Sequence, residues 1–408
     1  MKRTLAYVLI LMLLLTIVIG CTAAPAEPPA DSPETTAPTV DEEVSEMPTD
    51  EPQEGFSDVI KVRVGSGPYP HYQSFFLAKE WGIDDLFGLD FEISAFNNSA
   101  VGYEACVRGD VDITYGCIAE QVAVMQGAPD IRNFAYVGYF KGFFFVGRKG
   151  EMTEWSDLVA EMGLDEAIEY RRNEFKGKTI CVIPQKISLV VDMLEQVGLS
   201  EDDVEFLQFA DDQKGATAFM SGSGDIYIGG IPQQMTLTKM DEFINLGGYE
   251  ILGPAGVWYD TMASTDEFML NNREAALRTL ACMLFVEGLF ERDMQTFSEV
   301  CAAELTRLSG AEYTVEDFID MQTIYDEYQT YDLLDEGVFN PESHLYWMNP
   351  VAYNIRTALN DGILDDTMSL DEYCNVYFGE SEKLFKELQG REDLMALLAG
   401  VDEYQIPA

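Results

Sequence analysis

Strand-like and helix-like patterns follow one another along the first part of the folded chain. Residues 60–64 (IKVRV) alternate as a strand does and end at a Gly-Ser-Gly-Pro turn, and residues 75–80 carry helical spacing. The pattern then predicts a strand over 91–96, a helix over 102–108 and a strand over 111–115. Strand–helix–strand order of this kind predicts an α/β fold with parallel strand pairs.

The same pattern restarts near residue 178. It predicts, in order, a strand over 179–183, a helix over 188–197, a strand over 204–209, a helix over 215–220 and a strand over 225–228. Phe209 falls on Phe96 and Gln234 on Gln121, both at an offset of 113 residues, and nine of the 26 aligned pairs are identical without a gap. The repeat aligns DITYGC with DIYIGG, so we interpret the chain as two copies of one α/β unit.

Two α/β units joined by crossing segments predict a cleft, because ligands of open α/β sheets bind beyond the carboxyl ends of the strands. We expect residues 139–148 to form the first crossing and residues 258–270 the return. Residues 272–408 are mainly helical by pattern. Their run 277–292 is apolar on most faces, as expected of a helix packed against a lobe.

The N-terminal segment has the pattern of an export signal. Lys2 and Arg3 precede an uncharged run over residues 5–20, which is shorter than the roughly 20 residues that a membrane span needs. The run ends in Val-Ile-Gly-Cys, which resembles a bacterial lipobox with Cys21 as the lipidated residue and residues 1–20 as the cleaved signal peptide. A plain signal peptide or membrane anchor is the alternative.

Residues 21–57 differ in composition from the rest of the chain. The stretch from residue 22 holds seven of the 16 prolines, many acidic residues and no Lys or Arg. Such a segment cannot bury enough apolar surface to offset its ordering entropy, so we expect a disordered acidic stalk.

Charge and cysteine usage exclude several classes of function. A formal charge of −47 repels nucleic acid, so we exclude nucleic-acid partners. The six cysteines beyond Cys21 form no CxxC pair and their spacings do not suggest zinc, so we expect neither a metal nor a cofactor and predict no specific disulfide.

Several short motifs, in this order, resemble the substrate-binding lipoproteins of ABC importers, closest to the alkanesulfonate, nitrate, taurine and thiamine-precursor type. They are an A-x-x-x-G helix end at Ala78–Gly82, a G-x-V-D-I turn at Gly109–Ile113 and an F-K-G-K motif at Phe175–Lys178, after the lipobox and stalk. The resemblance covers roughly residues 60–290. The C-terminal part and an insertion near residues 151–174 depart from the family pattern.

The resemblance implies a type II periplasmic-binding-protein-like fold. Each of two lobes would hold a parallel-rich sheet flanked by helices, with a ligand cleft between the lobes. We expect lobe 1 to comprise residues 58–145 plus 255–408 and lobe 2 residues 146–254. The protein would then sit on the extracytoplasmic face of a bacterial membrane, anchored at Cys21, and deliver a small molecule to ABC permease subunits.

Candidate ligand contacts lie at the turns that follow the strands and at the two crossings. They are Tyr69, His71, Tyr72, Asn98, Tyr115, Gly116, Cys117, Lys141, Gln185, Ser188, Gly229, Gly230, Trp258 and Tyr259.

The reasons differ from one position to the next. Tyr69, His71 and Tyr72 offer polar-tipped aromatic faces, although His71 is equally interpretable as a loop cap. The glycines let a ligand or the next helix approach the backbone closely, and Asn98 either donates to a ligand or caps a helix. The residues at the crossings provide either a stacking platform or hinge packing.

Ligand chemistry follows from what stands near these turns. Few Lys or Arg accompany them, but many Tyr, Phe and Trp do, so we expect a planar, partly apolar, heterocyclic ligand rather than a small inorganic anion. Lys186 is either a cation for an acidic ligand or a solvated charge.

Two other classes of function compete with solute binding. An enzyme is disfavoured, because the chain has two histidines, no paired-metal spacing and no nucleophile elbow. A membrane-anchored ligand sensor or surface interaction protein on the same fold is the alternative to an importer component.

Overall fold

The computed structural model of the protein describes residues 56–407, apart from 97–98, 184–185, 211, 230 and 311. The expected signal peptide, Cys21 and nearly all of the expected stalk lie outside the described residues. Among the helices of the described part, none combines the length and the apolar character needed to cross a bilayer.

A six-stranded mixed sheet, sheet 1, has the strand order β11-β4-β10-β3-β1-β2. Its strands are β1 (Ile60–Ser66), β2 (Leu89–Ala95), β3 (Ile113–Cys117), β4 (Ile131–Phe140), β10 (Trp258–Thr265) and β11 (Asp326–Tyr328). β1 pairs in parallel with β2 and β3, whereas β10 and β11 run antiparallel to their neighbours. In β1 the alternation seen in the sequence places Val62 and Val64 in the core and leaves Lys61 exposed.

A five-stranded sheet, sheet 2, repeats this topology in the order β7-β6-β8-β5-β9. Its strands are β5 (Phe145–Arg148), β6 (Thr179–Val182), β7 (Glu205–Gln208), β8 (Ile226–Ile228) and β9 (Phe243–Asn245). β6 pairs in parallel with β7 and β8, as β1 does with β2 and β3, and β5 runs antiparallel to β8. The duplication inferred from the sequence is therefore confirmed at the level of strand order and direction.

The aligned aspartates and glycines of the repeat have the same structural roles in both copies. The Asp112 carboxylate accepts from the backbone N–H of Arg63 at 2.9 Å, and the Asp225 carboxylate accepts from that of Thr179 at 2.8 Å. Each aspartate thereby ties the start of one strand to its parallel neighbour. The aligned Gly109 and Gly222 both end a helix with positive φ, 75° and 97°, a backbone conformation that favours glycine.

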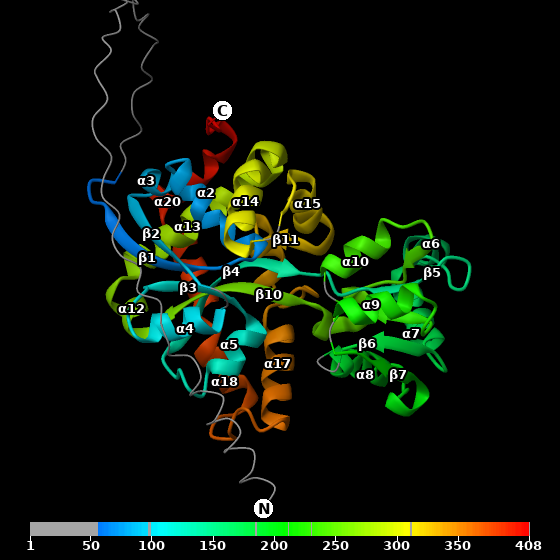
Figure 1. The fold of residues 1–408 in the computed structure, drawn as a ribbon. Helices are drawn as coiled ribbons and strands as arrows, with labels where there is room; N and C mark the ends of the chain where they lie inside the picture. Colours follow the sequence, from blue (N-terminus) through cyan, green and yellow to red (C-terminus); the bar gives the residue numbers. More distant parts are fainter. Residues whose placement is uncertain are drawn as a thin grey trace, which may run out of the picture. The chain divides into compact units, whose positions relative to one another are not determined.

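Helices surround both sheets (Figure 1). In the first half of the chain they are α2 (Ser74–Glu80), α3 (Ile83–Leu86), α4 (Ser99–Val107), α5 (Ile118–Val124), α6 (Trp155–Met162), α7 (Leu164–Glu174), α8 (Ile187–Glu195), α9 (Asp212–Met220), α10 (Ile231–Thr238) and α11 (Tyr249–Leu252). In the second half they are α12 (Asp266–Asn271), α13 (Arg273–Arg292), α14 (Met294–Ser309), α15 (Val315–Asp320), α16 (Tyr331–Leu333), α17 (Met348–Asn360), α18 (Leu370–Tyr377), α19 (Glu380–Gln389) and α20 (Glu392–Ala399).

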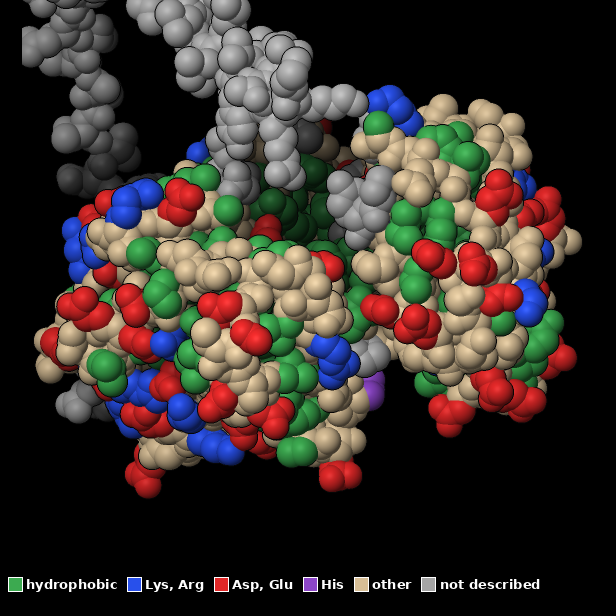
Figure 2. Space-filling model, turned by 90° about the horizontal axis from the view of Figure 1, so that it is seen from below, with side chains coloured by type: hydrophobic (Ala, Val, Ile, Leu, Met, Phe, Trp, Pro, Cys, Tyr) green, Lys and Arg blue, Asp and Glu red, His purple; other side chains and the backbone are tan. Residues whose placement is uncertain are grey.

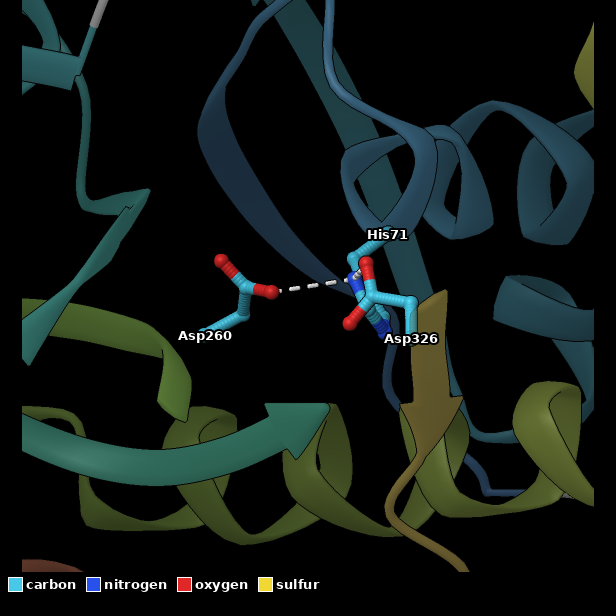
Figure 3. A group of neighbouring side chains, drawn as sticks. All are labelled: His71, Asp260 and Asp326. Carbon is cyan, nitrogen blue, oxygen red and sulfur yellow. Dashed lines mark ion pairs between the residues drawn. The ribbon is translucent and has the colours of Figure 1, made fainter. Parts of the chain in front are cut away.

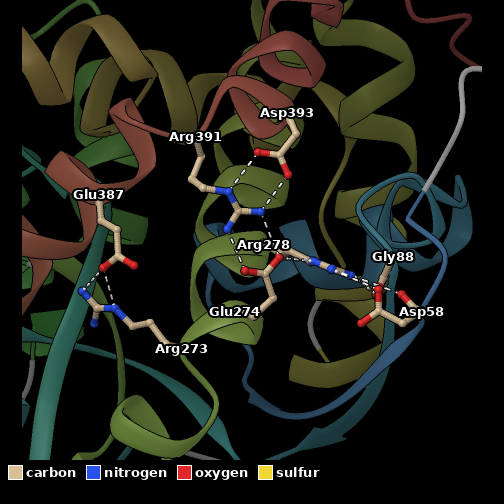
Figure 4. Close-up of polar contacts among 8 residues, drawn as sticks. All are labelled: Asp58, Gly88, Arg273, Glu274, Arg278, Glu387, Arg391 and Asp393. Atoms are coloured by element: carbon tan, nitrogen blue, oxygen red, sulfur yellow. Dashed lines mark hydrogen bonds and ion pairs between the residues drawn. The ribbon is translucent and has the colours of Figure 1, made fainter.

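The long helix α13 packs between sheet 1 and the C-terminal helices. Of its 20 residues, 15 are buried, which confirms the expectation for the apolar run 277–292. An arginine–carboxylate network holds α13 to α19 and α20 (Figure 4). Within it, Glu274 accepts from Arg278 at 2.8 Å and from Arg391 at 2.6 Å, and Arg273 bonds Glu387 at 2.7 Å.

Two backbone segments connect the sheets. β4 ends at Phe140, and β5 begins in sheet 2 at Phe145, after the connecting residues 141–144, as the expected first crossing requires. The chain returns through η4 (Gly253–Gly256) into β10. The return is shorter than expected, because residues 258–265 already belong to sheet 1. The short edge strand β11 was not expected, and it pairs with the last residues of β4 beside the crossing.

Candidate functional site

The loop after β1 is folded tightly by its own side chains. The Ser66 hydroxyl donates to the carbonyl of Tyr72 at 2.8 Å, and the Gln73 amide donates to the carbonyls of Gly67 and Tyr69, each at 2.8 Å. These bonds turn residues 67–73 back over the end of the strand. Of the aromatic residues in the loop, Tyr69 is 39% exposed, whereas Tyr72 is buried.

His71 lies at the centre of a buried ion-pair cluster (Figure 3). Its Nδ1 is 3.0 Å from Oδ2 of Asp260 on β10 and 2.9 Å from Oδ2 of Asp326 on β11. The sequence offered His71 as a ligand contact or a loop cap, and the structure shows it pairing with two carboxylates. The cluster fastens the loop after β1 to the last strands of the sheet.

Burial and neighbouring charge oppose each other at this cluster. Burial alone would lower the pKa of His71, but the carboxylates of Asp326 and Asp260 outweigh that effect and raise the pKa well above its usual range. Burial raises the pKa of Asp326 to about 7 against the lowering effect of His71. On α13, burial raises the pKa of the enclosed Glu287 carboxyl well above its usual value, and the charge of His71 lowers it only in part.

A second group of polar residues stands beside the cluster at the end of β3. Cys117, the last residue of β3, is the N-cap of α5, and its backbone N–H donates to the carboxylate of Glu120 at 3.3 Å. The pKa of Tyr69 is raised, chiefly by burial and then by the negative charge of Glu120, with smaller effects from Cys117 and Asp260. These residues therefore share one electrostatic environment, which links the ends of β1 and β3 with the start of β10.

Tyr72 and Tyr115 form a stacked pair beneath the loop. Their ring centroids are 4.6 Å apart and the ring planes differ by 1°. The Tyr72 hydroxyl is 3.4 Å from the hydroxyl of Ser99, and Tyr115 donates to the sulfur of Met283 at 3.6 Å. Both rings are buried, and they form the packed layer beneath the loop that carries Tyr69.

The two repeated glycines are places of close approach to aromatic side chains. A Cβ added at Gly116 would overlap the hydroxyl of Tyr103, and one added at Gly229 would overlap that of Tyr227. The sequence left open whether a ligand or the next helix requires glycine at these turns. In the structure a tyrosine already fills each space.

The candidate residues at the crossings have protein partners. Lys141 Nζ is 2.7 Å from the Glu327 carboxylate on β11. The Trp258 indole N–H donates to the carbonyl of Ala255 at 3.2 Å, and the hydroxyl of the buried Tyr259 donates to the carbonyl of Leu345. These contacts brace the region where the sheets are joined.

Ser188 is exposed at the start of α8, where α8, α5, Trp258 and α17 enclose a cavity of about 160 Å³. Its lining residues include Ala119, Val122, Ala123, Ser188, Leu189, Trp258, Tyr353 and Asn354.

In the space-filling view a hollow with hydrophobic side chains in its depth is visible (Figure 2). The candidates Asn98, Gln185 and Gly230 lie outside the described residues.

The ion-pair cluster is also the group in the described part whose atoms are placed as metal ligands would be. One nitrogen of His71 and one oxygen each of Asp260 and Asp326 lie within 4.8 Å of one another. The same atoms already contact one another at ion-pair distance, so charge pairing accounts for the arrangement.

Sequence reasoning missed the acidic members of this site. Asp260 stands inside the strand WYDTMA, where a carboxylate between apolar residues was a signal that went unused. Asp326 lies in the acid-rich stretch YDEY, which carries no strand pattern of its own because β11 has three residues. Glu120 was missed because an acidic residue in the first turn of a helix is common as a capping residue.

The arrangement of strands and helices matches that of solved binding proteins. The chain is similar to the periplasmic aliphatic sulphonate binding protein SsuA from Escherichia coli, at 12% identity and a TM-score of 0.54, over 76% of this chain and 91% of that one. It is similar to a putative periplasmic sulfonate-binding protein SsuA from Methylobacillus flagellatus KT, at 13% identity and a TM-score of 0.55, over 83% and 97% of the two chains. The periplasmic nitrate-binding protein NrtA from Synechocystis PCC 6803 matches at 13% identity and a TM-score of 0.50, over 82% and 89%.

No protein-family model matches the sequence, and no curated protein matches it. At these identities the structural likeness shows the fold. The chain has the two-lobed α/β fold of periplasmic binding proteins, as the sequence resemblance implied.

Proposed function

We propose that the protein is an extracytoplasmic solute-binding lipoprotein that captures a small organic molecule and delivers it to an ABC importer. The observation that carries the proposal is the fold, because two sheets of the same topology are joined by two short crossings and the chain is similar in structure to solved sulfonate- and nitrate-binding proteins. Closure of two lobes around a molecule sequesters it and changes the surface offered to a permease. No catalytic role is assigned to any residue.

The proposed lobe boundaries are residues 58–145 plus 255–408 for lobe 1 and residues 146–254 for lobe 2. Their support is that the strands of sheet 2 run from Phe145 to Asn245, and that sheet 1 resumes at Trp258. The same division would place the ends of β1 and β3 and the start of β10 at the mouth of the cleft.

The proposed anchor is a lipid on Cys21, with the acidic stalk holding the lobes away from the membrane. A Cys21→Ser substitution is expected to abolish incorporation of radiolabelled palmitate and to release the protein from the membrane fraction. Substitution of Cys106, a buried cysteine, is the matched control and is expected to leave labelling intact. Labelled protein after Cys21→Ser would contradict the anchor.

The binding function is tested with a thermal-shift screen of metabolites on the full-length protein. A ligand that binds only the folded state stabilises it by about 2.7 kcal/mol at 100 times its Kd. We expect Tyr69→Ala to abolish the shift with little change in the melting temperature of the free protein, because the side chain is 39% exposed. Tyr170→Ala on α7, at 48% exposure, is the matched control. Equal loss in both variants would contradict the proposed location.

A further inference from the structure

Negative charge exceeds positive charge among the described residues at the end of β1. Asp260, Asp326 and Glu120 contribute three carboxylates, and His71 is the single basic side chain that pairs with any of them. Of the cluster, Asp260 is the most open, with 17% of its side chain exposed against 6% for Asp326 and 2% for His71. The group nearest to solvent is therefore a carboxylate.

The neighbouring lysines do not offset this excess of negative charge, because each is paired with another carboxylate. Lys141 is bound to Glu327 at 2.7 Å, and Lys186 is bound to Asp212 at 3.0 Å. Between positions 97 and 230 the residues outside the described part are Asn97, Asn98, Pro184, Gln185, Asp211 and Gly230. None of them is basic, so they add no further cation.

A second observation is independent of this comparison of charges. The Asp326 side chain is buried, yet its Oδ1 has no hydrogen-bond partner within the described part of the chain. A buried acceptor without a donor is costly, so a ligand that supplies a donor at this place would be stabilised by it. Figure 3 shows the Asp260 and Asp326 carboxylates turned toward the same His71 ring.

Tyr69 adds an aromatic surface next to these carboxylates. Its ring is 5.0 Å from that of Tyr72 at 60°, and it is the exposed member of the pair. A cation over an aromatic face is attracted by the ring quadrupole, and desolvation strengthens the attraction. Carboxylate and exposed ring together provide both halves of a site for an organic cation.

We propose that the ligand of this site is an organic cation, an ammonium or a protonated heterocyclic amine carried on an aromatic or apolar body. The Asp260 carboxylate accepts its N–H groups, and Tyr69 covers its apolar part. This inference rests on the proposed binding function and specifies its ligand class. It separates the protein from the sulfonate and nitrate binders of similar fold, because an anion would lie beside the carboxylates of Asp260, Asp326 and Glu120, which His71 alone offsets only in part.

The test compares probes that share a benzyl group but differ in charge, by isothermal titration with the full-length protein. Benzylamine and N-methylbenzylamine, both protonated at neutral pH, are the cations, benzyl alcohol is the neutral probe and phenylmethanesulfonate the anion. We expect the cations to bind at least about tenfold more tightly than the other two, and to weaken as salt is raised from 20 to 200 mM, which shortens the Debye length about threefold. Equal affinity for all probes, or tighter binding of the sulfonate, overturns the inference and leaves the binding function standing.

A variant series assigns the effect to the carboxylates. Asp260→Asn is expected to weaken benzylamine binding by about tenfold or more, and Glu120→Gln severalfold, while phenylmethanesulfonate binding does not weaken. Asp366→Asn, an exposed carboxylate in the turn before α18, is the matched control. If Asp260→Asn fails to fold, Glu120→Gln decides alone. Unchanged cation affinity in the folded variants overturns the inference, and no binding of any probe or metabolite removes the proposed function with it.

Discussion

The ion-pair cluster makes a quantitative prediction about stability. A His71→Leu substitution introduces an apolar side chain of similar size. It leaves Asp260 and Asp326 side by side without a cation. The lost contacts are 3.0 and 2.9 Å long, between side chains that are 2%, 17% and 6% exposed. Removal of one partner from a buried pair costs about 3–5 kcal/mol, and uptake of a proton by Asp326 recovers part of it, so we expect a loss of about 3 kcal/mol.

The assay is urea unfolding of the full-length protein at pH 6, followed by circular dichroism. The matched control is Lys61→Met, which breaks a shorter ion pair, 2.5 Å, to Glu92, with side chains that are 58% and 50% exposed. Exposed pairs are screened by solvent and contribute little to stability, so the control is expected to unfold almost as the natural protein does.

A double variant separates charge pairing from packing. Asp326→Asn in the His71→Leu background removes the uncompensated carboxylate, so we expect it to recover about 1–2 kcal/mol of the loss. A cost for His71→Leu no larger than that of Lys61→Met would refute the reasoning, and so would a double variant less stable than the single one.

Two further predictions concern pH and backbone packing. The folded-state pKa values of His71 and Asp326 are both raised, so their contribution to stability is complete below the unfolded values and is lost as pH rises through the folded values. The urea midpoint is therefore expected to fall between pH 6 and pH 9, and to fall less in the His71→Leu, Asp326→Asn double variant, which retains neither group; an identical slope in the natural protein and the double variant would exclude the cluster as its source. Gly116→Ala is expected to cost about 1–3 kcal/mol in the same assay, because its Cβ would overlap the Tyr103 hydroxyl, whereas Gly127→Ala, with its nearest neighbour at 3.7 Å, stays within about 1 kcal/mol. Similar losses at both glycines would contradict the packing argument.

The fold was largely predictable because its signals are local. Each expected strand and helix of the two repeats is present within a few residues, since alternation, helical spacing and glycine stops act over short stretches. The repeat was visible because aspartates such as Asp112 and Asp225 fasten one strand to the next in both copies. Identical local roles keep identical residues.

The site was less predictable because it depends on contacts between distant residues. His71 was expected at the site, but its partners Asp260 and Asp326 lie far along the chain, and β11 is too short to show a pattern. The aromatic residues Tyr72 and Tyr115 were offered as ligand contacts, yet mutual stacking buries both. The sequence shows which turns carry aromatic residues, but it does not show which of those rings are exposed and which are buried.

The central claim is that a small organic molecule binds at the ends of β1 and β3. Hydrogen–deuterium exchange of the full-length protein, with and without the ligand that gives the largest thermal shift, tests this location directly. We expect slower exchange at the amides of residues 66–73 and 117–120 and at the crossing 141–144, where closure would reduce solvent access. Slower exchange confined to other segments, or unchanged exchange at saturating ligand, would contradict the account.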